Sequence, residues 1–136
     1  MEDRIKLPYR KNCEGYFFKG DKVLAQNTGL VFVLFPGGGI DEGESAKDAI
    51  LRETFEETGA VIRNLKKIGV IRFDWAEDWA KTEKQKKRYG LFRGGRCIYL
   101  VGRLRRLRGR LGIVMRVGGK VRFLLILKML FLGLRS

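Results

Sequence analysis

Histidine is absent from this chain of 136 residues, and cysteine and proline occur only twice each. Without histidine, the most common general base of enzymes is missing, and so are Ser-His and Cys-His nucleophile pairs. Cys13 and Cys97 lie far apart with no CxxC spacing, so we expect thiols rather than a zinc site or a disulfide. An enzyme built from this chain must therefore take its base from carboxylates or a metal ion.

Long apolar runs are also missing. The run at 123–132 has one lysine among ten residues, whereas a membrane-spanning helix needs about 20 apolar residues. The first residues show no basic region followed by an apolar run, so we expect no secretory signal and a cytoplasmic location. The length favours a single domain over residues 1–136.

Acidic residues are absent after Glu83. Residues 1–83 hold all 15 acids and 13 bases, whereas residues 84–136 hold 16 bases, so the net charge of +14 belongs to the second segment. Three interpretations of residues 94–136 are open: a basic appendage, a segment with a buried helix at 121–134, and text read out of frame. A frameshift near Gly94 is a hypothesis because displaced acid-rich codons yield many Arg, Gly and Lys codons.

The remaining pattern predicts a mixed α/β domain. Residues 45–58 are helix formers, with Ser45 and Asp48 as a capping signal and Gly59 as a stop. Residues 37–44 are expected to form a tight glycine loop before this helix. Strands are expected at 12–18, 23–26 and 30–35, the first two forming a hairpin, and two more within 61–75 on either side of 63–67.

The predicted helix carries three carboxylates on one side. At about 100° per residue, Glu53, Glu56 and Glu57 share a narrow arc beside an apolar stripe. The stripe consists of Ile50, Leu51, Thr54 and Phe55. Like charges on adjacent turns destabilise a helix by roughly 0.2–0.5 kcal/mol per pair, so a cation should compensate. Mg²⁺ held by carboxylates and substrate phosphates fits this need, and a solvated acidic face is the alternative.

The segment from Gly38 to Ala60 resembles the Nudix box. Gly38 is followed after five residues by Glu44, and after seven more by Arg52-Glu53-Thr54-Phe55-Glu56-Glu57-Thr58-Gly59-Ala60. Every fixed Gly, Glu and Arg of the motif is in place, although Thr54 and Ala60 stand where the family usually has aliphatic residues. The resemblance covers residues 10–75 and implies a Nudix-type three-layer α/β/α sandwich, an α/β (α+β) fold around a mixed β-sheet.

The resemblance also implies roles for the matching residues. Mg²⁺, with Mn²⁺ as a substitute, would be held by Glu53, Glu56, Glu57 and the backbone carbonyl of Gly37. The catalytic residues would be Glu53 as the preferred base, Arg52, which orients Glu53, and Glu57. Gly38 and Glu44 would brace the loop behind the ligands.

The residues after the box carry a weaker signal for the substrate. Trp75 and Trp79 lie near several lysines, so the rings could stack on a base while the cations hold phosphates. Core aromatics beside a solvated basic turn are the alternative.

Members of the Nudix family typically hydrolyse a nucleoside diphosphate linked to another group, and we expect a Mg²⁺-dependent pyrophosphohydrolase. The alternative is a catalytically silent Nudix-fold module that binds nucleic acid through the basic C-terminal segment. A nucleotide-type small molecule is the expected partner, nucleic acid is less favoured, no membrane is expected, and a homodimer is left open.

Overall fold

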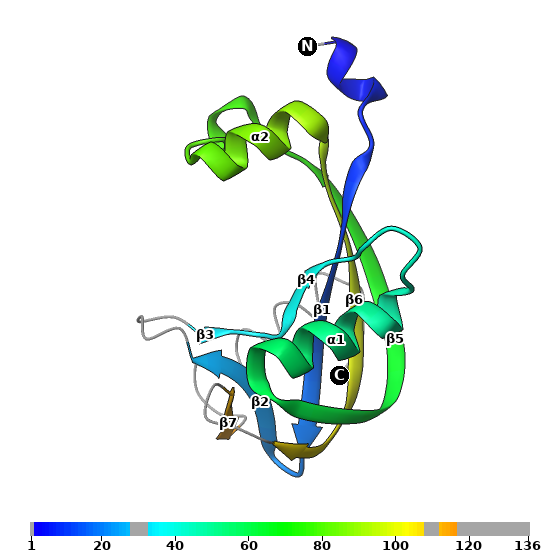
Figure 1. The fold of residues 1–136 in the computed structure, drawn as a ribbon, viewed down its shortest axis with the longest axis vertical. Coiled ribbons are helices and arrows are strands. Elements are labelled where there is room, and N and C mark those ends of the chain that lie inside the picture. Colours follow the sequence, from blue (N-terminus) through cyan, green and yellow to red (C-terminus); the bar gives the residue numbers. More distant parts are fainter. Residues whose placement is uncertain (1, 28–32, 108–111, 117–136) are drawn as a thin grey trace.

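The centre of the molecule is a mixed β-sheet organised around two long strands, β1 and β6. The computed structural model describes residues 2–27, 33–107 and 112–116. Its strand order is β3-β2-β1-β6-β5, with β4 paired to β1 and β7 paired to β2. β1 and β6 run parallel from the Tyr9–Gly94 pair to the Phe18–Arg103 pair, and the other described strand pairs are antiparallel. The mixed α+β architecture is the one expected (Figure 1).

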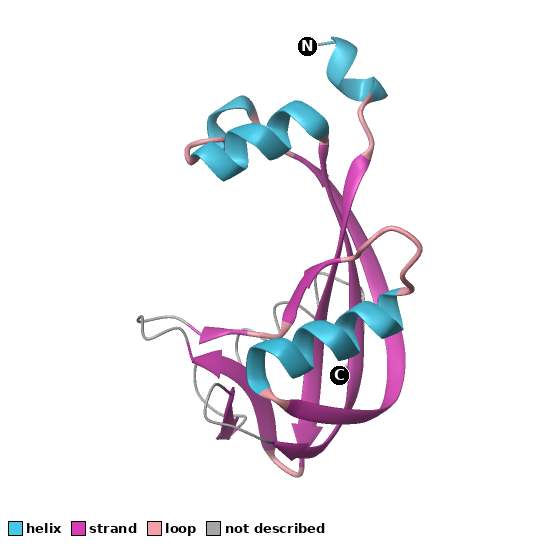
Figure 2. Ribbon diagram, in the orientation of Figure 1, coloured by secondary structure: helices cyan, strands magenta, loops and turns pink. Residues whose placement is uncertain are grey.

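The elements follow one another along the chain as strands interrupted by two helices (Figure 2). In order they are η1 (Glu2–Lys6), β1 (Tyr9–Lys19), β2 (Lys22–Asn27), β3 (Val33–Leu34), β4 (Gly37–Gly39), α1 (Ala46–Thr58), β5 (Ala60–Asp74), η2 (Glu77–Trp79), α2 (Glu83–Leu91), β6 (Gly94–Leu107) and β7 (Gly112–Arg116).

The predicted hairpin is confirmed, because β1 and β2 pair antiparallel across a tight turn at Gly20. The prediction of two strands within 61–75 is wrong. A single strand, β5, runs through the segment and pairs with β6 over its whole length. Residues 63–67, which suggested a break, are accommodated by register shifts between Val61 and Gly69. Asn64 adopts a left-handed φ of 57° there.

Helix α1 begins and ends where local signals predicted. The Ser45 side chain accepts a hydrogen bond from the Asp48 backbone at 3.1 Å, and Gly59 adopts φ 71° to close the helix. The buried face consists of Ala49, Ile50, Thr54 and Thr58. Leu51 and Phe55 are exposed, so the apolar stripe predicted for this helix was too wide. The helix packs on the sheet through the four buried residues.

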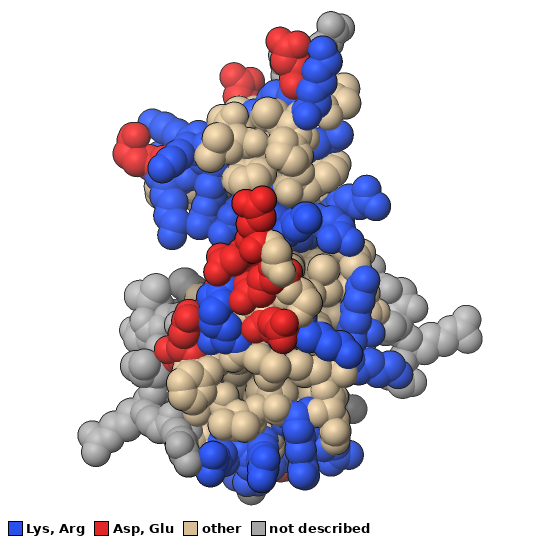
Figure 3. Space-filling view, turned by 45° about the vertical axis from the view of Figure 1, so that its right-hand side comes forward, with Lys and Arg blue, Asp and Glu red and all other residues tan. Residues whose placement is uncertain are grey.

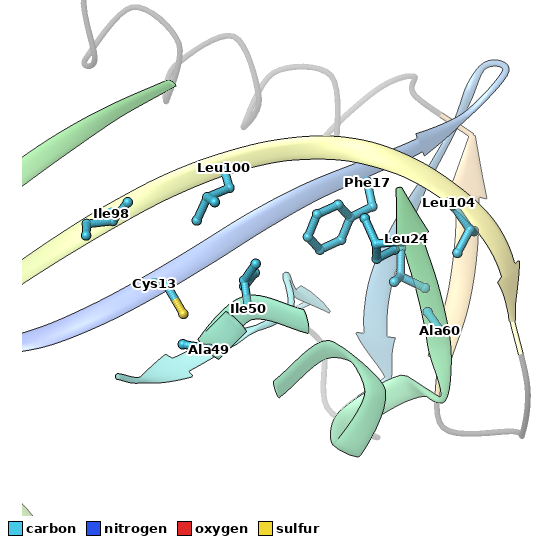
Figure 4. Close-up of a cluster of buried hydrophobic side chains, with 10 residues drawn as sticks. Cys13, Phe17, Leu24, Ala49, Ile50, Ala60, Ile98, Leu100 and Leu104 are labelled. Atoms are coloured by element: carbon cyan, nitrogen blue, oxygen red, sulfur yellow. The ribbon is translucent and has the colours of Figure 1, made fainter. Parts of the chain in front are cut away.

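The main core lies between α1 and the sheet (Figure 4). Phe17 and Leu24, from β1 and β2, meet Ile50 of α1 and Leu100 of β6, and all four are completely buried. Burying side chains of this size contributes roughly 1.5–3 kcal/mol each. A second cluster of Tyr16, Val23 and Phe35 is separate from this core. Packing of α1 on β1 and β6 therefore sets where the acidic face of α1 stands.

Cys13 and Cys97 carry thiols rather than a disulfide, as expected. Cys13 lies on β1 opposite Gly38 of β4, and its burial in the core raises its pKa to about 12. The Cys13 thiol is therefore protonated and unreactive at neutral pH.

The acid-free segment contributes an interior strand of the sheet. β6 covers residues 94–107 and lies between β1 and β5. The predicted helix at 121–134 lies outside the described residues. Among the described residues, no helix is long and apolar enough to cross a membrane.

Thr54, where the family usually has an aliphatic residue, generates a stability prediction. Its side chain is completely buried, and its Oγ1 has no hydrogen-bond partner among the described residues. An unpaired buried hydroxyl costs about 1–3 kcal/mol, so Thr54→Val should raise the free energy of unfolding by about 1 kcal/mol in urea titrations.

Thr58→Val is the matched control. The Thr58 hydroxyl donates to the Thr54 carbonyl at 2.6 Å and accepts from the Ala60 backbone at 3.2 Å. Its removal should destabilise the protein by about 1–2 kcal/mol. Equal effects of the two substitutions would contradict the assignment.

Candidate active site

Arg52 is the hub of the cluster that the motif predicted. Its guanidinium donates to both carboxylate oxygens of Glu44 at 2.9 Å and to Glu53 at 3.0 Å. It also donates to the Gly39 carbonyl at 3.2 Å, and approaches Glu56 at 3.4 Å. The Arg52 bond holds the pKa of Glu44 at about 2. Arg52 thus joins the loop, β4 and helix α1.

The three glycines before the helix form strand β4, not the tight loop predicted. Gly37, Gly38 and Gly39 pair with Glu14, Cys13 and Asn12 of β1. None of them has a positive φ, so the need for glycine is spatial. A Cβ on Gly37 would lie 2.3 Å from the Cys13 carbonyl, and one on Gly38 would lie 2.6 Å from the Glu53 carboxyl carbon. Glycine is therefore required at these positions because α1 and β1 approach the β4 backbone closely.

The carboxylates of α1 meet at this strand. Glu57 accepts a hydrogen bond from the Gly37 backbone at 3.4 Å, while Glu53 lies against Gly38. Burial raises the pKa of Glu57 to about 7, and the charges of Glu53 and Glu56 add to the rise. Two carboxylates on one face with little solvent create a need for positive charge.

The donor set fits a hard divalent cation. All candidate donors are oxygens, from Glu53, Glu56, Glu57 and the Gly37 carbonyl, which suits Mg²⁺ or Mn²⁺. Among the described residues no group of three acidic or cysteine side chains is already arranged as a metal site. The reason is visible in the contacts: Arg52 holds Glu53, and Glu57 turns to the Gly37 backbone.

Arg10 is a residue that the motif gave no reason to select. It lies on β1, and its Nη2 stands 2.7 Å from where a Cβ of Gly39 would be. Its guanidinium also donates to Asn12. Burial and the charge of Arg88 lower the pKa of Arg10, while Glu53 raises it. A half-buried cation thus stands beside the acidic cluster, and only the pairing of β1 with β4 brings it there.

A pocket with aromatic residues lies next to β4, and the sequence did not predict it. Phe35, Phe73 and Tyr99 line a pocket of about 270 Å³, with the backbone of Gly37 and Gly38 as one edge. Tyr99 stacks on Tyr16 with ring centroids 6.4 Å apart. The pocket has the composition of a site for a flat ring next to the acidic cluster.

The structure places Trp75 and Trp79 away from the acidic cluster of α1. They follow the end of β5 and stack on each other, with centroids 3.9 Å apart and an interplanar angle of 6°. Trp75 lines a separate pocket with Arg4, Tyr89 and Arg93. In Figure 1 this end of β5 lies beside α2, far from α1. The predicted substrate role of the two rings stays a prediction.

The family model described as "NUDIX domain" matches residues 16–107. A curated RNA pyrophosphohydrolase from Cereibacter sphaeroides is 32% identical over 101 residues, which cover 69% of this chain and 57% of the relative. A second one, from Sphingopyxis alaskensis, is 44% identical over 70 residues, covering 43% of this chain and 40% of the relative. The chain thus spans about half the length of these relatives.

Solved structures share the fold. The Bacillus subtilis pyrophosphohydrolase BsRppH superposes with a TM-score of 0.62 at 20% identity, covering 82% of this chain and 65% of that one. MutT of Aliivibrio salmonicida and Vibrio cholerae gives a TM-score of 0.54 at 17% identity, covering 79% of this chain and 78% of that one.

The raised pKa of Glu57 predicts a pH-dependent stability of the metal-free protein. Because the pKa rises from 4.5 to about 7 on folding, the contribution of Glu57 to stability is fully present below about pH 4.5 and is lost as pH rises through about 7. Glu57→Gln removes this loss, so in EDTA the variant should exceed the original by roughly 1–2 kcal/mol at about pH 8 and match it at about pH 4.5.

Urea unfolding with EDTA at the two pH values measures this difference. Glu42→Gln, at an exposed carboxylate in the loop before α1, is the control and should show no such dependence. A gap between Glu57→Gln and the original protein that is the same at both pH values would contradict the assignment.

The contact between Gly38 and Glu53 predicts a separation of fold from activity. In Gly38→Ala the new methyl group displaces the flexible Glu53 carboxylate, so stability should change little while catalysis drops about 100-fold. Gly90→Ala, where a Cβ meets nothing within 4 Å, should keep full activity. Thermal unfolding and steady-state kinetics of both variants test this; unchanged activity in Gly38→Ala would disprove the role of the contact.

Proposed function

The chain belongs to the Nudix family, whose model matches residues 16–107, and on that premise we propose that it is a Mg²⁺-dependent pyrophosphohydrolase. The observation that carries the proposal is the Arg52 cluster, which holds Glu53 against Gly38 and leaves Glu57 at Gly37. The substrate class is a nucleotide whose diphosphate is linked to another group. The 5′ end of RNA is the leading candidate, because the curated relatives are named RNA pyrophosphohydrolases.

The roles of the residues follow from their surroundings. Glu56 and Glu57, with the Gly37 carbonyl, would hold Mg²⁺, and Glu53 would accept the proton of the attacking water. Mg²⁺ supplies neutralisation of phosphate charge and a lower pKa of water when it is bound. Arg52 keeps the Glu53 carboxylate pointed at the reacting atoms, and Glu44 fixes Arg52 through two bonds.

Two further features favour a nucleotide. Arg10 places positive charge beside Glu53, where the phosphates of the substrate would lie. The pocket of Phe35, Phe73 and Tyr99 offers a stacking surface for a base on the other side of Gly37 and Gly38. The substrate would then span β4, with its phosphates at the acids and its base in the pocket. A cytoplasmic location stays a prediction.

Release of pyrophosphate or phosphate from a substrate panel tests the proposal. The panel comprises 5′-triphosphorylated RNA, nucleoside triphosphates and nucleoside diphosphate derivatives, each with Mg²⁺ and with EDTA. We expect turnover only with Mg²⁺. Glu57→Gln should lose metal affinity and at least about 100-fold in kcat/KM, while Glu53→Gln should keep the metal and lose kcat.

Glu42→Gln serves as the exposed control and should leave turnover unchanged. Full activity of Glu57→Gln would refute the metal role. RNA binding with no turnover of any substrate would support instead the catalytically silent binding module.

The hypothesis of a frameshift also stays a prediction. Strand β6 moves the expected position of the shift from near Gly94 to after Leu107. We propose that the native frame extends at least to Leu107, because residues 94–107 pair on both sides with β1 and β5 and fall within the matched family model. Sequencing of the gene should show a second frame rich in Asp and Glu codons only after codon 107. Stop codons throughout the other frames there would rule out a shift.

A further inference from the structure

Helix α2 exposes a row of cations that the site described above does not use. Lys84, Lys86, Lys87 and Arg88 occupy four of its nine positions, and no residue of the helix is buried. Glu83 pairs with Lys86 at 3.6 Å, both side chains being largely exposed. Within the described part of the chain, no carboxylate forms an ion pair with Lys84, Lys87 or Arg88. The helix therefore presents uncompensated positive charge to solvent.

The fold holds this helix in place in spite of its charge. Lys84 lies one turn before Lys87 and Arg88, and like charges at this spacing oppose helix formation. Thr82 and Gln85 close a capping box at its start. At its end, Arg4 donates to the carbonyls of Tyr89 and Phe92 at 2.7 and 2.9 Å. The helix is thus capped at its start and tied to η1 at its end, and its cationic side chains remain available to an anionic partner.

The cations of α2 connect with the acidic cluster through Arg10. Arg10 lies against Gly39, whose carbonyl is bound by Arg52, and its charge interacts with both Glu53 and Arg88. Lys84 and Lys87 lie within one turn of Arg88 on α2. Figure 3 shows the acidic side chains in the middle of this face, with lysine and arginine side chains above and beside them. A polyanion that starts at the acidic cluster can therefore continue along α2.

Two classes of polyanionic partner differ in what else they require. A membrane surface needs a broad apolar face on the helix, whereas α2 is polar and carries only Leu91 as an exposed large apolar residue. Single-stranded nucleic acid needs cations along its backbone and aromatic rings for its bases. Trp75 and Tyr89 line a pocket beside α2, whose lining also includes Asp74 and Glu77. One face of each ring is already covered, by Trp79 and by Arg4 respectively, so the cations of α2 carry the argument for a nucleic acid.

We propose that Arg10 and the Lys84, Lys87 and Arg88 face of α2 bind the backbone of single-stranded RNA downstream of the terminal nucleotide held at the acidic cluster. The proposal rests on the proposed function and makes it more specific. It makes the substrate a polynucleotide rather than a free nucleotide, and gives the basic helix the task of holding its chain.

The test compares two double variants of the full chain. Lys84→Ala with Lys87→Ala removes two cations of the proposed surface and adds strong helix formers. Lys19→Ala with Lys22→Ala removes two exposed lysines at the β1–β2 turn, at the opposite end of β1 from α2. Both variants lower the net charge equally, so a general effect of charge would appear in both. Thermal unfolding confirms that each is folded.

Binding is measured in EDTA, without catalysis, by fluorescence anisotropy of a 3′-labelled single-stranded RNA over a series of salt concentrations. The α2 variant should bind roughly tenfold more weakly at about 0.1 M salt, and the slope of log K against log salt should fall by about 1.4. The variant at the β1–β2 turn should change less than about twofold. Equal loss in the two variants, or loss of binding to phosphatidylserine vesicles with RNA binding unchanged, would overturn the proposal.

Turnover with Mg²⁺ separates this proposal from the proposed function. In the α2 variant kcat/KM should fall for 5′-triphosphorylated RNA by a factor similar to the loss of affinity, and stay unchanged for a nucleoside triphosphate. An equal fall for both substrates would overturn the role of α2 and leave the hydrolase standing. Absence of turnover in the unmodified protein would overturn the hydrolase and leave the binding experiment decisive for α2.

Discussion

The site depends on the hydrogen bonds that the guanidinium of Arg52 donates. Its two bonds to Glu44 fix the direction of the side chain as well as its position, and its remaining donors reach Gly39 and Glu53. One side chain thereby joins the loop, strand β4 and helix α1. The side chain is only 30% exposed, so water competes weakly for these bonds. Without Arg52, the carboxylates that it separates would repel one another and lose their common geometry.

Charge is sorted over short distances around this cluster. Burial, together with the neighbouring carboxylates of α1, raises the pKa of Glu57 and favours a cation, while α2 carries uncompensated cations that favour an anion. Arg10 stands between the two, in electrostatic contact with Glu53 and Arg88. A site for a divalent cation next to a row of cationic side chains suits a substrate that carries several phosphates. The total charge of +14 conceals this division.

Local features were predictable because their causes are local. Ser45 and Gly59 end α1 by hydrogen bonds and backbone conformation within a few residues, and the spacing of Glu53, Glu56 and Glu57 follows from the helical repeat. Features that depend on distant partners were not. The predicted buried face of α1 was too wide, because Phe55 has no sheet opposite it. The segment of β5 was predicted as two strands, because only pairing with β6 allows one strand to continue through its bulges. Trp75 and Trp79 became a stacked pair beside α2.

The sequence by itself determined the helix, its caps, the family motif and the identity of the acidic residues, because each is written within about 25 consecutive residues. The tertiary structure alone decided the rest. Parallel pairing of β1 with β6 brings residues 94–107 into the interior of the sheet. Pairing of β1 with β4 places the glycines against Glu53 and brings Arg10 to the same place. These contacts join residues far apart in the chain, and no repeat or spacing in the sequence records which strands will be neighbours.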